Sequence, residues 1–253
     1  MRTGVESAAT DVLLPPEQEA KLGQQIEQEL ASQVRFITDP KVTSYVSDVE
    51  GRIVAAAKTE APNLSIKLHV IDDAKTVNAF ATPGAQLYVY TGLLLAAKDE
   101  SELAAVLGHE TGHIIARHPA RQTVNQFGLD ALKGVVLGQN GSLLTSMAAQ
   151  IGSQGYLAAN SRADETEADE YGARFASRAH YDPRALGEFL QRISSGEAPG
   201  IMVFLQDHPT TPDRVEHLNA YIAQNGLTGQ RVQSDRLTEI QRALGSAAPQ
   251  HQP

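Results

Sequence analysis

The chain has 253 residues, of which 42% are hydrophobic and 20% charged, and its formal net charge is −9. This composition is typical of a globular protein with a sizeable core, and a negative charge without a basic cluster argues against nucleic acid as a partner. Cysteine is absent. Disulfides and thiolate metal sites are therefore excluded, and any metal must be bound by histidines and carboxylates.

The beginning and the end of the chain differ from the rest in composition. Residues 1–14 lack the apolar core of a signal peptide, and we expect a flexible segment there. The tail 244–253 is predicted to be disordered by its composition. Between them we expect a single domain over residues 15–243. No stretch approaches the roughly 18 apolar residues of a membrane-spanning helix.

The first part of this domain is predicted to hold two helices and then a small sheet. Apolar residues recur at helical spacing from 15 to 36 and again from 39 to about 61. Residues 64–71 alternate apolar and polar side chains, which indicates a half-buried strand. Short strands are expected at 78–81 and 86–90.

Two questions about these strands stay open. An edge strand beside a cleft can hydrogen-bond an extended peptide, whereas in the simpler reading Tyr88 and Tyr90 only pack the sheet. His69 falls on the polar face of its strand. We therefore expect a solvated histidine rather than a metal ligand.

Residues 99–118 predict an amphipathic helix. Asp99 is suited to cap its N-terminus, and Glu102 follows at the spacing of a capping box. Leu103, Val106 and Leu107 lie on one face. Pro119 is expected to end the helix.

This helix contains the pattern H-E-x-x-H, formed by His109, Glu110 and His113. Histidines four residues apart stand one turn above each other, so both imidazoles can bind one ion. The neighbouring Glu110 can then reach a water on that ion and take its proton. The alternative is a chance pair of surface histidines.

Residues 122–156 are rich in glycine, alanine, serine and leucine, and they predict helices with a turn near 138–141. The segment 128–156 is a mobile lid, a surface for a partner or a membrane, or an ordinary helical hairpin.

A later helix, from 162 to about 180, carries Glu165, Glu167, Asp169 and Glu170. Glu165 and Asp169 are four apart and share a face, whereas Glu167 lies about 200° around the helix from Glu165. A Glu from a later helix can complete three protein ligands, and a carboxylate one turn further can accept the other ring N–H of a ligand histidine. The alternative is a solvated acidic face.

The remaining helices are expected from 184 to 194 and after Pro212. Between them, residues 204–214 predict a proline-rich loop that contains His208. A histidine in such a loop either faces the cleft or is simply exposed.

Four blocks in this order resemble a known family. They are Asn78–Gly84 leading to Leu95, the helix Glu102–His118, the motif S-R-x-x-E-x-x-x-D of Ser161–Asp169, and the H-P…R segment from His208 to Arg214. Together they are similar to the gluzincin metallopeptidases, a family that includes the HtpX heat-shock protease, the CAAX prenyl endopeptidases and the periplasmic protease BepA. The resemblance implies an α+β, mostly helical zincin-type domain with a small sheet flanking the cleft.

The resemblance also implies a site that binds one zinc ion. Glu165 would be the third zinc ligand beside His109 and His113. Asp169 would be the partner of His109, and His208 would face the zinc.

The implied activity is that of a zinc endopeptidase. Glu110 would be the general base, and His208 or Arg214 would stabilise the oxyanion together with the metal. The alternative is a zinc-bound chaperone or adaptor for envelope assembly with little turnover. Four protein ligands would favour that alternative, whereas an open water position would favour the enzyme.

The same resemblance suggests the partners and the compartment. We expect a peptide or an unfolded protein as substrate, with a cell-envelope assembly protein as a further partner. Without a transmembrane segment, the chain is expected to be soluble or peripheral to a membrane, in the periplasm or another extracytoplasmic compartment.

Overall fold

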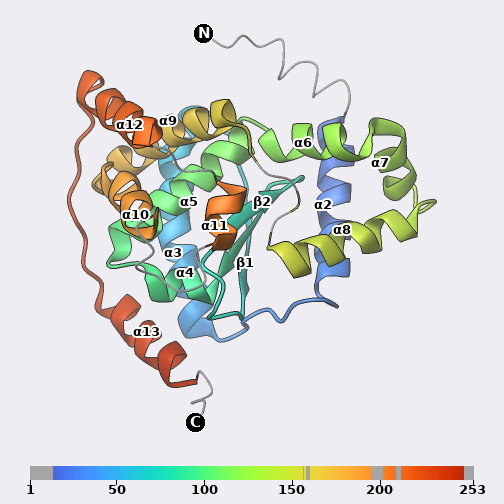
Figure 1. Cartoon of the computed structure of the whole chain (residues 1–253), viewed down its shortest axis with the longest axis horizontal. Coiled ribbons are helices and arrows are strands. Elements are labelled where there is room, and N and C mark those ends of the chain that lie inside the picture. Colours follow the sequence, from blue (N-terminus) through green and yellow to red (C-terminus); the bar gives the residue numbers. More distant parts are fainter. Residues whose placement is uncertain (1–13, 156, 158–159, 195–201, 209–211, 248–253) are drawn as a thin grey trace.

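The computed structural model describes residues 14–155, 157, 160–194, 202–208 and 212–247. Helices surround one three-stranded sheet (Figure 1). The expected α+β, mostly helical fold with a small sheet is therefore confirmed. The expected flexible N-terminus lies outside the described residues except for Leu14, as does the part 248–253 of the expected tail.

The sheet consists of β1 (Lys67–Ile71), β2 (Ala79–Thr82) and β3 (Gln86–Tyr90), in the order β1-β3-β2. The central strand β3 runs parallel to β1 and antiparallel to β2. Side chains alternate between the two faces of a strand. Leu87 and Val89 therefore join one buried cluster, while Tyr88 and Tyr90 join another. Both tyrosines are buried and pack the sheet.

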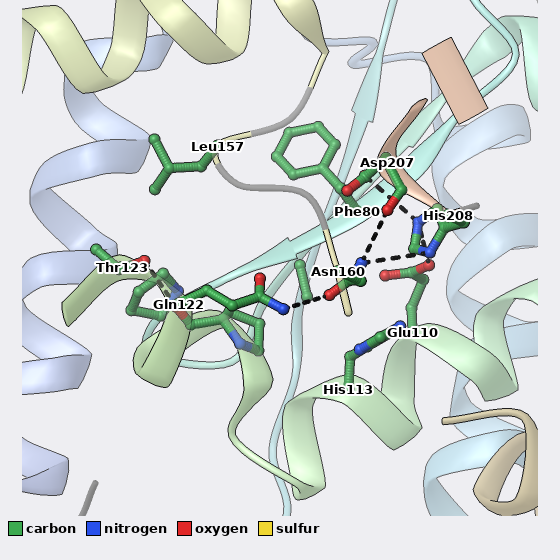
Figure 2. A pocket seen from close by; sticks show the side chains of 12 residues that line it. Phe80, Glu110, His113, Gln122, Thr123, Leu157, Asn160, Asp207 and His208 are labelled. Atoms are coloured by element: carbon green, nitrogen blue, oxygen red, sulfur yellow. Dashed lines mark hydrogen bonds and ion pairs between the residues drawn. The ribbon is translucent and has the colours of Figure 1, made fainter. Parts of the chain in front are cut away.

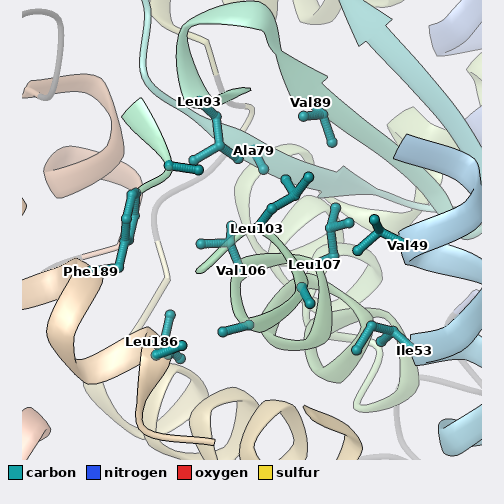
Figure 3. Close-up of a cluster of buried hydrophobic side chains, with 14 of the residues drawn as sticks. Val49, Ile53, Ala79, Val89, Leu93, Leu103, Val106, Leu107, Leu186 and Phe189 are labelled. Atoms are coloured by element: carbon teal, nitrogen blue, oxygen red, sulfur yellow. The ribbon is translucent and has the colours of Figure 1, made fainter. Parts of the chain in front are cut away.

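The larger cluster lies on the Leu87 face and surrounds helix α5 (Glu100–Ile115). Figure 3 shows Leu103, Val106 and Leu107 of α5 packed among side chains from the sheet and the neighbouring helices. The helices that contribute side chains to this cluster besides α5 are α3 (Pro40–Ala57), α4 (Thr91–Ala96), α9 (Arg162–Arg178), α10 (Ala185–Ser194), α11 (Met202–Asp207), α12 (Pro212–Gln224) and α13 (Asp235–Ala247). Because it is enclosed on all sides, α5 is a rigid element on which to build a site.

The second cluster lies on the tyrosine face of the sheet. It is covered by α2 (Pro16–Leu30), α6 (His118–Phe127), α7 (Leu129–Val136) and α8 (Gly141–Gln154). Within the segment expected as a lid or a hairpin, α7 and α8 pack against α2 (Figure 1). Buried side chains of α7 and α8 belong to this cluster.

Several boundaries differ from the sequence-based expectation. Helix α5 ends at Ile115, because Arg117 adopts a left-handed conformation with φ of 56°. Pro119 lies in the first turn of α6, so it helps to begin the next helix rather than ending α5. The expected loop from Phe204 begins instead within the short helix α11 (Met202–Asp207). Helix α13 continues past residue 243 to Ala247.

The expectation of a solvated His69 is wrong. Its side chain is only 10% exposed, stacks on Tyr88 at 4.8 Å between ring centroids, and has Nε2 2.9 Å from Oε1 of Gln86. Phe36 covers it from the connection after α2. The position of His69 is therefore explained by its contacts with Tyr88, Phe36 and Gln86, without a metal. Among the described residues, no helix is both long and apolar enough to cross a membrane.

Candidate metal centre

Helix α5 begins at a well-capped N-terminus that defines where its later residues lie. The side chain of Asp99 accepts a hydrogen bond from the Glu102 N–H at 3.0 Å. The Glu102 carboxylate in turn accepts from the Lys98 N–H at 2.8 Å, so the reciprocal bond forms one residue before the cap. Two to three turns further on, His109 and His113 are buried on one face of the helix.

Helix α9 packs against α5 at unusually short range. Its N-terminus is closed by a capping box between Ser161 and Asp164. A Cβ atom built on Gly112 of α5 would lie 2.9 Å from the Ala168 carbonyl oxygen. A Cβ atom on Gly172 of α9 would lie 2.9 Å from the backbone nitrogen of His109. The missing side chains therefore let the helices approach until α9 directs its acidic face at the histidines of α5.

Four side chains converge between these helices and α11. Nε2 of His109 lies 3.0 Å from Nε2 of His113 and 3.2 Å from Nδ1 of His208. Oε1 of Glu165 lies 3.2 Å from His113 Nε2 and 3.1 Å from His208 Nδ1. One ligand atom from each of the four lies within 4.8 Å of the others, and all four residues are buried.

This donor set fits a metal ion. Three imidazole nitrogens and a carboxylate oxygen point at one volume, where a cation would balance their lone pairs. Imidazole and carboxylate donors without thiolate are ligands that zinc accepts. Burial lowers the pKa of His109 and of His113, which favours the neutral form that binds a metal.

Asp169 and Arg214 form the layer behind these donors. Oδ1 of Asp169 lies 2.9 Å from Nδ1 of His109. Arg214 donates to both carboxylate oxygens of Asp169, at 2.7 and 2.8 Å, and its Nη1 lies 2.6 Å from Oε2 of Glu165. Burial raises the pKa of Glu165, but the Arg214 and His208 charges outweigh it and hold that pKa well below the usual range. The oxyanion role expected for Arg214 stays a prediction, since the guanidinium here faces two carboxylates.

Glu110 lies beside the cluster, and burial raises its pKa well above the usual range. Its Oε1 is 3.3 Å from Nε2 of His208. Burial lowers the pKa of His208, but Asp207, Glu165 and Glu110 outweigh that effect and raise it well above normal. His208 is therefore surrounded by three carboxylates that attract its protonated form.

A cavity opens beside Glu110 and His113 (Figure 2). Phe80 of the edge strand β2 lines one side. Gln122 of α6 donates to Asn160 at 2.6 Å, and the Asn160 side chain donates to the Asp207 carbonyl at 3.3 Å. The edge strand, the donor cluster and the end of α11 thus share one cavity.

Sequence reasoning missed His118, Asn160 and Asp207. His118 is fully buried, with Nδ1 only 2.8 Å from Nδ1 of His113. The spacing of five residues to His113, just before a proline that begins a helix, was a usable signal. Asn160 and Asp207 carried no local signal, because they meet only through the packing of distant segments.

A buried H-E-x-x-H helix with a carboxylate supplied by a later helix defines a metallopeptidase centre of the gluzincin type. The chain belongs to Peptidase family M48, which its sequence matches over residues 40–222.

Named relatives agree with this membership. The chain is 34% identical over 185 residues to the mitochondrial metalloendopeptidase OMA1 of Schizosaccharomyces pombe. The matched residues cover 71% of this chain and 53% of that protein. It is 31% identical over 202 residues to the beta-barrel assembly-enhancing protease of Yersinia pestis, covering 76% and 40% respectively. It is 27% identical over 157 residues to the metalloprotease LoiP of Escherichia coli, covering 61% and 62%. The chain thus spans about half or less of the length of the first two relatives.

Proposed function

We propose that this chain is a zinc-dependent endopeptidase. The proposal rests on one observation: His109, His113 and Glu165 converge in a buried cluster with Glu110 at its edge. In this proposal the first three residues bind a single zinc ion. The family membership supports metal-dependent peptide hydrolysis as the chemistry.

A bound zinc ion would make a water molecule more acidic and polarise the scissile carbonyl. Glu110 takes the proton of that water and passes it to the leaving amine. Burial raises the pKa of Glu110, which suits a carboxylate that has to accept a proton and then pass it on. Asp169, held on both oxygens by Arg214, orients the ring of His109.

The test is Glu110→Gln, which keeps the size of the side chain and removes the base. We expect unchanged zinc content and at least about a hundredfold slower cleavage of casein, the low end for removing a general base. Cleavage at the wild-type rate would remove Glu110 from the mechanism. Wild-type protein that binds no zinc would remove the proposed function itself.

A second candidate function follows from the position of His208. As a fourth donor within the cluster, a neutral His208 would occupy the place of the catalytic water. Such a closed site would give a latent protease or a zinc-bound chaperone or adaptor with little turnover. If the protein is a latent protease, His208 acts as a latch: it blocks the water position at rest and stabilises the oxyanion once it is displaced.

For the biological setting we propose protein quality control in the cell envelope, with peptides or unfolded proteins as substrates and an assembly protein as a further partner. The beta-barrel assembly-enhancing proteases among the relatives support this choice. The compartment would be periplasmic or otherwise extracytoplasmic, with the chain soluble or peripheral to a membrane. Fractionation of the producing cells, with cleavage products compared between wild type and Glu110→Gln, tests the assignment.

A further inference from the structure

His118 lies behind one of the two motif histidines, in a place that the proposed mechanism does not use. It is the first residue of α6 and is fully buried. The left-handed backbone of Arg117 turns the chain so that His118 lies beside His113. Arg117 is itself held in place, because its Nη2 donates to the Leu14 carbonyl just before α2 at 2.8 Å and its Nε donates to Glu19 of α2 at 3.0 Å.

The contacts of His118 form a chain from the cluster to the surface. Nδ1 of His118 lies 2.8 Å from Nδ1 of His113, with the ring centroids 4.9 Å apart. On the other side of the ring, Nε2 lies 3.3 Å from Oε2 of Glu167, whose side chain is 40% exposed. Asp164 lies further from the same nitrogen, at 3.6 Å, and it is also bound by Arg121.

The chemistry of these atoms determines where each hydrogen lies. A carboxylate only accepts hydrogen bonds, so His118 must donate to Glu167 through Nε2–H. In the neutral ring Nδ1 of His118 is then an acceptor, and the hydrogen in the short contact must come from Nδ1 of His113. The lone pair of His113 is thereby left on Nε2, the nitrogen 3.2 Å from Glu165 in the cluster.

We propose that His118, backed by Glu167, is a positioning residue that holds His113 in the tautomer and ring orientation needed to bind the metal through Nε2. This inference rests on the proposed function. It gives the two motif histidines separate supports of different chemistry: the Asp169 carboxylate behind His109 and a neutral imidazole behind His113. It also gives Glu167 a function other than that of a ligand.

The experiment measures zinc affinity by competition with a chelator, the visible spectrum of the Co²⁺-substituted protein, and the unfolding temperature of the metal-free protein. The variants are His118→Leu, His118→Asn and Glu167→Ala. Asparagine retains an acceptor near the position of Nδ1, whereas leucine fills space without one. Glu170→Ala is the matched control, because Glu170 is on the same helix but pairs with His217 at the surface.

We expect His118→Leu to bind zinc roughly 10–100-fold more weakly and to shift the Co²⁺ bands, as is usual when the partner of a ligand histidine is lost. His118→Asn should recover most of the affinity. Glu167→Ala should show a smaller loss, because Asp164 remains nearby, and Glu170→Ala should match the wild type.

Wild-type affinity and spectrum in His118→Leu would overturn the inference. Equal losses in the Leu and Asn variants would also overturn it, since the volume of the side chain rather than its acceptor would then matter. Equal affinities for Glu167→Ala and Glu170→Ala would remove the link to Glu167. If His118→Leu fails to fold, the test rests on His118→Asn and on the comparison of Glu167→Ala with Glu170→Ala. A wild-type protein without zinc affinity is a separate result, which counts against the proposed function.

Discussion

Glu165 and Glu167 are two residues apart on α9, yet they have different neighbours. Glu165 is 1% exposed and lies in the cluster, whereas Glu167 reaches the surface beside His118. We expect Glu165→Ala to lose zinc far more readily than Glu167→Ala, because only Glu165 directs an oxygen at His113 and His208. Chelator competition on both variants measures the difference, and equal affinities would show that Glu165 is not the ligand.

Asp169→Asn belongs in the same series as an intermediate case. An amide keeps the size of the side chain but loses the negative charge beside His109 and Arg214. We expect a loss of roughly 10–100-fold in zinc affinity or activity, as for other carboxylates behind a metal ligand. An affinity as low as that of Glu165→Ala would instead make Asp169 part of the ligand set.

The proposed latch role of His208 can be tested by substitution. We expect His208→Ala and His208→Arg to change casein cleavage at constant zinc content, because His208 lies both in the donor cluster and 3.3 Å from Glu110. A rise in activity indicates that the closed form dominates, and a fall indicates an oxyanion role. Cleavage at the wild-type rate in both variants at every pH assayed would contradict the latch role of His208.

At the scale of whole helices, the contact between α5 and α9 sets the distances in the site. Their close approach depends on residues without side chains, since a Cβ on Gly112 would lie 2.8 Å from Cβ of Tyr171 and 2.9 Å from the Ala168 carbonyl oxygen. Neither α9 backbone atoms nor the base of the Tyr171 side chain can move without shifting the helix. The distance from Glu165 to the histidines therefore depends on a glycine inside the H-E-x-x-H motif.

Gly112→Ala tests this dependence. We expect a loss of about 1–3 kcal/mol in the unfolding free energy, typical of an overpacked core, together with weaker zinc binding. Gly51→Ala on α3 is the control, because a Cβ there meets nothing within 4 Å. It should gain up to about 1 kcal/mol from helix propensity alone. Urea unfolding of the metal-free proteins measures both, and equal stability changes would contradict the packing argument.

For the molecule as a whole, the site lies where several separately packed parts meet. Apolar residues of α5 and α9 belong to the larger hydrophobic cluster. Phe80 of the cavity and apolar residues of α6 belong to the hydrophobic cluster on the tyrosine face of the sheet. Four buried donors of the site come from three segments of the chain. Metal binding should therefore stabilise the junction of these segments more than the periphery.

Removal of the metal tests this expectation. We expect a chelator to lower the unfolding temperature, since zinc at 100 times its dissociation constant adds about 2.7 kcal/mol to the native state. Hydrogen exchange should increase at the ends of α5 and α11 more than in α8, which has no residue in the donor cluster. The same unfolding temperature with and without metal would contradict a structural contribution of the ion.

The sequence alone determined the features that depend on local geometry. Helical periodicity and the Asp99 cap predicted α5, and residues four apart on a helix must share a face whatever surrounds them. The pairs His109 with His113 and Glu165 with Asp169 were therefore predictable as pairs. The sheet strands were also predictable from local signals: β1 from its alternation of apolar and polar residues, and β2 and β3 as short runs on either side of the turn at 82–84.

The tertiary structure decided how these local units meet. It brought His208 next to His109 across 99 residues of sequence, and it turned Arg214 toward two carboxylates. A left-handed residue that no propensity rule anticipates brought His118 to His113. Such contacts depend on helix packing distances and on the direction in which the chain leaves each helix. Those quantities arise only when all segments pack together, so no pattern within a single segment encodes them.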